Sequence, residues 1–235
     1  MSAQLFVSAV REHHSVLAAA EKRALVAMAA RMPARINSDH LTALSGIAML
    51  GAGASFWLAA YWPPALALVV VWLAINWFGD SLDGTLARVR RIERPRYGFY
   101  LDHLTDAYST IAIGFGLGLS PYMLLAVGLA IVVAYLVLSI NVYLETHAFG
   151  EFTFSYGALG PTEVRLVLIA LNLTALVVGP LAFTLLGVGM TVFDVAGLAI
   201  VIAMGGLLAS RVDHNLTRLA ALEPARRTAA EEVQP

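Results

Sequence analysis

Four aspartates stand in two close pairs within otherwise apolar stretches of the chain. Asp80 and Asp83 are three residues apart, and Asp102 and Asp106 are four residues apart. On a helix, either spacing places both side chains of a pair on one face. Four carboxylates gathered in or near a membrane would repel one another and would be costly to desolvate, so a cation should lie among them. Carboxylate oxygens suit Mg²⁺ or Mn²⁺, which makes a divalent metal the expected cofactor.

The composition indicates a membrane protein with several spans. The 235 residues are 59% hydrophobic and only 13% charged, whereas soluble domains carry about 25% charged residues. Six apolar segments have the roughly 20 residues that a membrane-crossing helix needs. The expected fold class is therefore all-α and integral to the membrane, with spans at about 40–60, 64–88, 99–119, 121–146, 162–185 and 192–216.

The distribution of basic residues predicts the orientation. With the N-terminus inside, all 15 Lys and Arg residues fall on the inner side or at inner helix ends, and none falls in the outer connections at 61–63, 120 and 186–191. The positive-inside rule then places both termini in the cytoplasm. At ~1.5 Å per residue, the four aspartates lie about 20–28 Å from the outer face of a core about 30 Å thick. They should therefore share one depth, just inside the cytoplasmic boundary.

The two ends of the chain differ from the spans. Residues 1–36 form a predicted amphipathic helix, which Pro33 ends and whose basic residues favour a place on the inner membrane surface. A soluble helix packed on the rest of the protein is the alternative. Residues 37–222 make one six-span domain, and residues 223–235 are expected to be a disordered tail. The absence of cysteine excludes disulfides and thiolate sites, and a net charge of -1 gives no sign of a nucleic-acid partner.

The residues around the aspartates suggest phosphoryl transfer. Gly84 and Ala87 leave a helical face with almost no side-chain bulk, which permits the close approach of a ligand. Metal ions held by carboxylates polarise phosphoryl oxygens, and Arg88 with the basic run after it offers ligands for phosphates. That run comprises Arg90, Arg91, Arg94 and Arg96. Asp106 is the deepest aspartate and the natural base for the proton of an attacking hydroxyl.

The stretch from Asp80 to Asp106 resembles the signature of the CDP-alcohol phosphotransferase family. The resemblance rests on eight fixed residues at fixed spacings across the second and third predicted spans: Asp80, Asp83, Gly84, Ala87, Arg88, Gly98, Asp102 and Asp106. Every defining position of the signature is filled, and the similarity in topology covers nearly the whole chain. The family often has Pro-Asn before Leu-Thr at the start of the first span. Here the stretch is Asn37-Ser38-Asp39-His40-Leu41-Thr42, without the proline.

The resemblance implies both an activity and an assembly. It implies a homodimer of six-helix protomers with a binuclear metal site, and displacement at the β-phosphate of a CDP-linked alcohol with release of CMP. Asp80, Asp83, Asp102 and Asp106 would bind the metals, and Asp106 would also act as the base. The nucleotide pocket would be lined by Asp80, Gly84, Ala87, Arg88 and Gly98. The similarity to short bacterial members favours CDP-diacylglycerol as donor, a small polar alcohol as acceptor, and the bacterial inner membrane as location.

Several alternatives stay open on the sequence alone. Glu163, Arg165 and Arg211 are candidates for binding the acceptor, although charges at inner helix ends also serve as snorkelling residues or dimer salt bridges. Within the class, the enzyme could instead transfer a CDP-linked headgroup to a lipid alcohol such as diacylglycerol. A cation transporter is the alternative from another class. Glu145 is expected to be solvated. Gly114, Gly116 and Gly118 suggest close packing or a flexible helix, and the Gly114–Gly118 spacing also suggests a dimer contact between helices.

Overall fold

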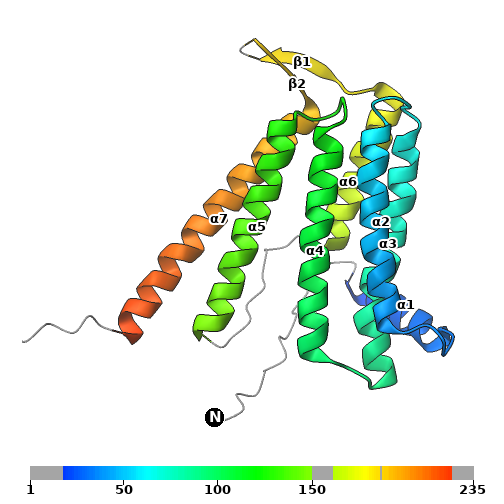
Figure 1. The fold of residues 1–235 in the computed structure, drawn as a ribbon, viewed down its shortest axis with the longest axis vertical. Helices are drawn as coiled ribbons and strands as arrows, with labels where there is room; N and C mark the ends of the chain where they lie inside the picture. Colours follow the sequence, from blue (N-terminus) through cyan, green and yellow to red (C-terminus); the bar gives the residue numbers. More distant parts are fainter. Residues whose placement is uncertain (1–17, 150–160, 186, 224–235) are drawn as a thin grey trace, which may run out of the picture.

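The fold is a bundle of long helices. The computed structural model describes residues 18–149, 161–185 and 187–223, and within them it contains seven helices and one two-stranded hairpin. Figure 1 shows α2 to α7 side by side, with α1 across one end of the bundle and the hairpin at the other. The elements are α1 (Ala18–Arg31), α2 (Ser38–Leu58), α3 (Ala65–Arg90), α4 (Pro95–Gly118), α5 (Leu125–Phe149), α6 (Pro161–Val178), β1 (Ala182–Leu185), β2 (Val188–Thr191) and α7 (Val192–Leu222).

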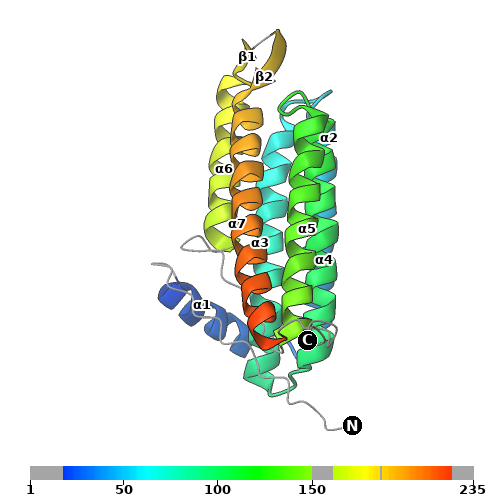
Figure 2. The ribbon, with the colours of Figure 1, turned by 90° about the vertical axis from the view of Figure 1, so that its left-hand side faces the viewer.

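The first described helix packs on the bundle at a steep angle. Figure 2 shows α1 inclined to the long helices at their lower end. Leu25 and Ala29 are buried in a cluster with Leu41 of α2 and Leu82 and Leu86 of α3. The helix ends at Arg31, shortly before the proline that was predicted to stop it. The first part of the predicted amphipathic helix lies outside the described residues.

Helices α2, α4 and α5 approach one another through glycines. A Cβ on Gly53 of α2 would lie 2.3 Å from the carbonyl oxygen of Ala112 in α4, and a Cβ on Gly116 would lie 2.2 Å from the carbonyl oxygen of Gly53. A Cβ on Gly114 would meet Val132 of α5 at 2.3 Å, and one on Gly118 would meet Leu125 at 2.9 Å. The prediction of close packing at these glycines is confirmed. The suggested dimer contact through them is wrong, because they face neighbouring helices of the same chain.

Four helices are long and apolar enough to cross a membrane, among the residues that the structure describes: α2, α3, α5 and α7. This supports an integral membrane protein. Helix α4 has 24 residues but carries Arg96, Asp102 and Asp106 in its first half. In α6 the apolar helical stretch is the shorter segment Arg165–Val178.

The predicted extension of the fifth span to residue 185 is wrong. Helix α6 ends at Val178, and Gly179 follows with a φ of 84° before Pro180. A left-handed glycine and then a proline is a strong helix stop. Residues 182–185 and 188–191 instead form two antiparallel strands, and the last helix begins directly after the second strand.

Candidate active site

Three of the four aspartates converge between α3 and α4. Asp80, Asp102 and Asp106 each present a carboxylate oxygen, and these oxygens lie within 4.8 Å of one another. All three side chains are half-buried. Helices α3 and α4 both pack against α2 and run antiparallel to each other, so the end of α3 and the start of α4 lie at the same end of the bundle (Figure 1). The three carboxylates form a set of oxygen donors that fits a divalent cation.

Asp83 is held differently from the other three. Its Oδ2 accepts a hydrogen bond from the Thr42 hydroxyl at 2.7 Å, and its Oδ1 accepts one from the backbone N–H of Gly84. The hydroxyl of Ser38 donates to the Asp83 carbonyl oxygen at 2.7 Å. Helix α2 therefore fixes this carboxylate and the backbone around it. Its role as a metal ligand stays a prediction.

Arg165 brings a positive charge from α6 to the aspartate cluster. Its Nη2 donates to Asp80 Oδ2, and its Nε donates to Asn76 Oδ1 at 2.8 Å. Asn76 in turn donates from Nδ2 to the Ser45 hydroxyl at 2.9 Å. The side chains of Arg165 and Asp80 are only 16% and 26% exposed, so this is a largely buried ion pair. It fixes the guanidinium beside one oxygen of the cluster.

The other two candidates for acceptor binding have different surroundings. Arg211 of α7 forms a salt bridge at 2.9 Å with Glu145 of α5. The Glu145 side chain is only 13% exposed, so the prediction that it is solvated is wrong. The reason is its charged partner, which compensates the loss of water. Glu163 lies in α6, but its side chain is outside the described part of the structure.

The residues predicted to line the nucleotide pocket leave an open surface. A Cβ on Gly98 would meet no atom within 4 Å, and one on Gly84 would meet only the Arg88 guanidinium, at 3.3 Å and beyond. Arg88 is exposed and donates to the Thr85 hydroxyl at 3.1 Å. Ala87 is half-buried next to it. The structure therefore leaves room for a ligand beside this part of the motif.

Two arginines of the basic run serve the fold. Arg90 donates to the carbonyl oxygens of Met32, Pro33 and Ile36 in the connection between α1 and α2. Arg94 pairs with Asp39 at the start of α2 and lies 4.0 Å from the centre of the Tyr97 ring. These contacts hold the helix ends around the site together. Because both guanidinium groups already have protein partners, fewer arginines of the predicted basic run are available to bind a phosphate.

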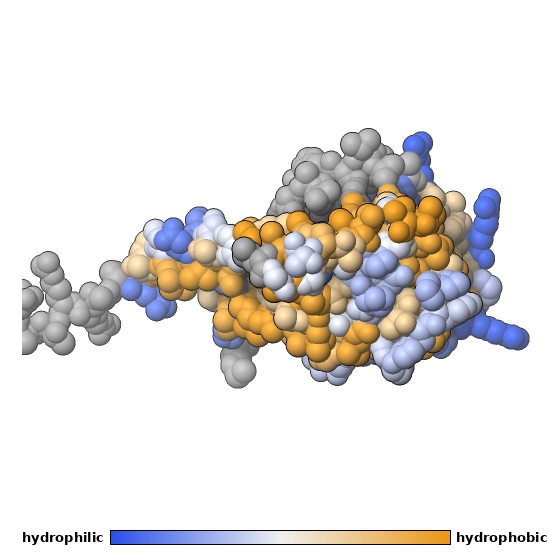
Figure 3. Space-filling view, turned by 90° about the horizontal axis from the view of Figure 1, so that it is seen from above, coloured by the Kyte–Doolittle hydropathy of each residue, from blue (hydrophilic) through white to orange (hydrophobic). Residues whose placement is uncertain are grey.

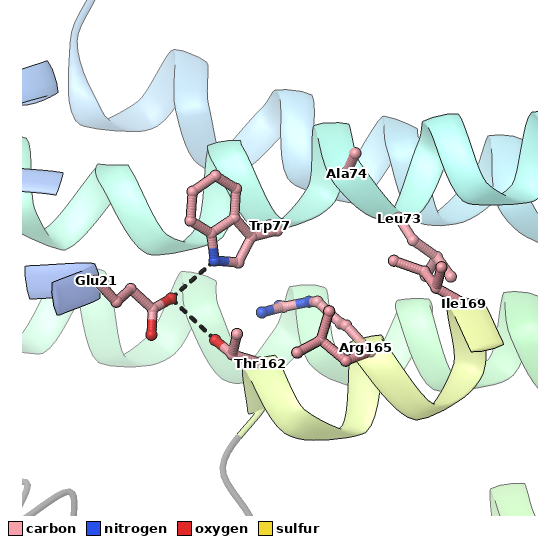
Figure 4. Close-up of a pocket in the computed structure, with 8 residues that line it drawn as sticks. Glu21, Leu73, Ala74, Trp77, Thr162, Arg165 and Ile169 are labelled. Atoms are coloured by element: carbon pink, nitrogen blue, oxygen red, sulfur yellow. Dashed lines mark hydrogen bonds between the residues drawn. The ribbon is translucent and has the colours of Figure 1, made fainter. Parts of the chain in front are cut away.

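A groove of about 370 Å³ adjoins the cluster on the side of α6. Figure 4 shows Arg165 reaching from α6 toward α3, with Trp77 and Glu21 beyond it. Glu21 Oε1 of α1 accepts hydrogen bonds from Trp77 Nε1 at 2.7 Å and from the Thr162 hydroxyl at 2.9 Å. The remaining walls are apolar and come from Leu73, Ala74, Leu166 and Ile169. Arg165 lines the groove and also contacts Asp80, so its side chain connects the groove with the aspartate cluster.

Several contributors to the site were not identified from the sequence. Asn76 precedes Asp80 by four residues and thus shares its helical face, a signal that was available. Thr42 and Ser45 could not be found in this way, because their contacts depend on how α2 packs on α3. His103 lies between α4 and α5, against Phe99 and Tyr143, with ring centres 4.1 and 5.5 Å away.

Comparison with known proteins agrees with the motif. Residues 36–209 match the family of CDP-alcohol phosphatidyltransferases. The match covers well over half of the chain and includes α2 to α6 and the first part of α7. No curated protein matches the sequence.

Proposed function

The chain belongs to the CDP-alcohol phosphatidyltransferase family, an enzyme family of phospholipid synthesis, and we propose that it transfers a phosphatidyl group from CDP-diacylglycerol to a small polar alcohol. The acceptor hydroxyl oxygen bonds to the β-phosphorus, the bond from that phosphorus to the bridging oxygen breaks, and CMP leaves. The observation that carries the proposal is the convergence of Asp80, Asp102 and Asp106 beside Arg165 and an open, small-residue surface.

The aspartates fit a resident Mg²⁺ or Mn²⁺ site, and we propose two ions held by Asp80, Asp83, Asp102 and Asp106. Three carboxylates within 4.8 Å are a hard, oxygen-only donor set. When bound, the ions polarise the phosphoryl oxygens and neutralise charge on the leaving pyrophosphate oxygen. The hydroxyl of Thr42 and the N–H of Gly84 orient Asp83 toward this task.

The remaining residues of the motif receive roles in binding and proton transfer. Gly84, Ala87 and Gly98 present little bulk, so a nucleotide can approach the backbone of α3 and α4 closely. Arg88, exposed at the same end, would bind the pyrophosphate. Asp106 accepts the proton of the attacking hydroxyl. Arg165 holds the acceptor beside the cluster, with Glu163 and Arg211 as further candidates for its polar groups.

We also propose the full topology and assembly. Helices α2 to α7 would all cross the membrane, with α1, the aspartates and the end of α7 on the cytoplasmic side of a bacterial inner membrane. All Lys and Arg residues fit that side, which supports the orientation. The active form would be a homodimer, with α1 lying at the membrane surface.

An assay of CMP release tests the reaction. Purified protein in nanodiscs is supplied with Mg²⁺ or Mn²⁺, CDP-diacylglycerol and a panel of polyols, amino alcohols and phosphorylated alcohols. CMP should appear only with a suitable acceptor and with metal. A parallel arm offers soluble CDP-headgroups with diacylglycerol. CMP from that arm alone would reverse donor and acceptor, and no CMP from either arm would contradict the proposed activity.

A further inference from the structure

The β1–β2 hairpin has one face of large apolar side chains and a second face of small residues that includes two threonines. Its register pairs Phe183 with Met190 and Leu185 with Val188. Directly opposed residues of an antiparallel pair share a face, and successive residues alternate between faces. The first face therefore carries Phe183, Leu185, Val188 and Met190. The second face carries Ala182, Thr184, Gly189 and Thr191.

Both faces of β1 are exposed within the described residues. This includes the apolar face that carries Phe183 and Leu185. Phe183, Leu185 and Val188 are 39%, 51% and 48% exposed. A two-stranded hairpin is marginally stable alone in water, and an exposed apolar hairpin with open edges is prone to pair with other chains. We therefore expect another surface, of lipid or protein, to cover this apolar face.

The base of the hairpin is firmly fixed. Asp194, which is 1% exposed, accepts hydrogen bonds from the backbone N–H groups of Thr191 and Leu124, both at 2.7 Å. The Thr191 hydroxyl donates to the carbonyl oxygen of Tyr122. These bonds tie the start of α7 to the connection between α4 and α5. The hairpin thus projects from the bundle at a set place rather than as a loose loop.

The position of the hairpin along the bundle axis can be derived from the ion pair at the other end of α6. Arg165 contacts Asp80, and α6 runs antiparallel to α3. Val178 lies thirteen residues beyond Arg165, and Ala65 lies fifteen residues before Asp80. At ~1.5 Å per residue these are rises of about 20 and 22 Å. The hairpin therefore begins level with the first turn of α3, at the membrane face opposite the aspartates (Figure 1).

The surface around the hairpin continues the apolar belt of the helices. No charged residue occurs between Arg165 and Asp194. Exposed apolar side chains lead into the hairpin and out of it, namely Val177, Val178, Leu181, Val192 and Val195. Seen from this end, the described surface is orange with pale-blue patches between, and deep blue lies toward its edges (Figure 3).

We propose that the hairpin is an interfacial membrane anchor, whose apolar face inserts into the lipid leaflet opposite the active site. Among the described residues, neither strand pairs with a third strand along its outer edge, so this backbone does not fit the hydrocarbon core and requires the hydrated headgroup layer. In that layer the Phe183 face turns toward the acyl chains and the Thr184 face turns toward water. The anchor sets the depth of the short helix α6, which carries Arg165.

Site-directed spin labelling tests the anchor, since the natural chain has no cysteine. Single cysteines replace Phe183, Leu185 and Val188 on the apolar face, and Thr184 and Gly189 on the second face as matched controls. The labelled full-length protein is reconstituted in nanodiscs. Collision with lipid-soluble O₂ should exceed collision with a water-soluble nickel chelate at the first three positions, with the reverse at the two controls.

Two results would overturn the proposal. Preferential access of the nickel chelate at all five positions would place both faces in water. Strong spin–spin broadening at the apolar-face positions would show that a second copy of the hairpin covers them instead of lipid. Circular dichroism of each variant before reconstitution verifies that the helical fold is intact. The double variant Leu185→Ser, Val188→Cys is compared with Val188→Cys alone, because it makes the same face less apolar. In that variant the label should move toward the nickel chelate.

Discussion

Asp80 is shared between two interactions that oppose each other. One of its oxygens accepts from Arg165, and the same carboxylate belongs to the group that fits a metal ion. A guanidinium beside the cluster lowers the negative potential that attracts a divalent cation. The arginine thus lowers the cost of burying the carboxylates, and at the same time it would limit the affinity of the proposed site for a metal ion.

Replacing Arg165 with Gln should therefore tighten metal binding. We expect the dissociation constant for Mn²⁺ to fall by about tenfold, which is about 1.4 kcal/mol, because Asp80 loses its buried counter-ion. Turnover with the acceptor should fall in the same variant. Electron paramagnetic resonance of free Mn²⁺ measures the affinity. Arg94→Gln, which removes an exposed arginine paired with Asp39, is the control and should leave the affinity unchanged; weaker Mn²⁺ binding in Arg165→Gln would refute the competition.

Substitution of Asp106 with Asn should separate chemistry from binding. The amide keeps the size of the side chain but cannot take a proton, so turnover should fall by at least about 100-fold. CDP affinity, measured by isothermal titration calorimetry, should change little. Asp213→Asn, an exposed position on α7, should leave turnover unchanged. Near wild-type turnover in Asp106→Asn would assign the base to another residue.

Helix α4, which carries Asp102 and Asp106, is positioned by glycine contacts near its other end. Gly116 of α4 touches Gly53 of α2, and Gly114 touches α5, so backbones approach directly. Interiors packed this closely tolerate added atoms poorly. The separation of α3 and α4, and with it the shape of the aspartate cluster, depends on these contacts.

Gly53→Ala should destabilise the bundle. Its Cβ would lie 2.3 Å from the carbonyl oxygen of Ala112, which forces α2 and α4 apart. We expect a loss of about 1–3 kcal/mol, seen as a lower midpoint of thermal unfolding in detergent. Gly205→Ala on α7, where a Cβ would meet no atom within 4 Å, is the matched control and should be neutral or slightly stabilising. Equal midpoints for both variants would contradict the close contact.

Docking of α1 should depend on the Glu21 side chain. Glu21→Ala removes an acceptor shared by Trp77 and Thr162, whereas Glu21→Gln keeps a carbonyl oxygen at the same place. The loss of two hydrogen bonds should weaken docking by roughly 1–3 kcal/mol. Amide hydrogen exchange in α1 should accelerate markedly in Glu21→Ala and only slightly in Glu21→Gln. Unchanged exchange in Glu21→Ala would mean that the apolar contacts of Leu25 and Ala29 suffice.

At the scale of the whole molecule, the aspartate cluster could be predicted because it depends on local spacing. The intervals within each pair, together with two consecutive antiparallel helices, place Asp80, Asp102 and Asp106 at one level of the bundle. How α3 and α4 turn these faces toward each other depends on their common packing against α2. The ion pair of Arg165 with Asp80 could not be derived, since it depends on which helix packs against α3. The hairpin was missed because its residues are as apolar as a span, although Gly179-Pro180 offered the signal of a helix end.

The polar and apolar parts of the molecule gather at opposite ends of the bundle, and the proposed chemistry lies at the polar end. The α3–α4 connection, the start of α2, helix α1 and the end of α7 gather there, and with them the four aspartates of the motif. The opposite end carries uncharged connections and the hairpin. A charged donor with two acyl chains can meet the aspartates at such an end while its chains stay in lipid.

The fate of a labelled β-phosphate tests the proposed reaction most directly. CDP-diacylglycerol carrying ³²P in the β-position is incubated with the protein, Mn²⁺ and each ³H-labelled alcohol in turn. We predict one lipid product that contains both labels in equal amounts, together with unlabelled CMP, and no such product with Asp106→Asn. Recovery of ³²P only in unreacted donor or in phosphatidic acid, across the whole panel of alcohols, would contradict transfer to an alcohol.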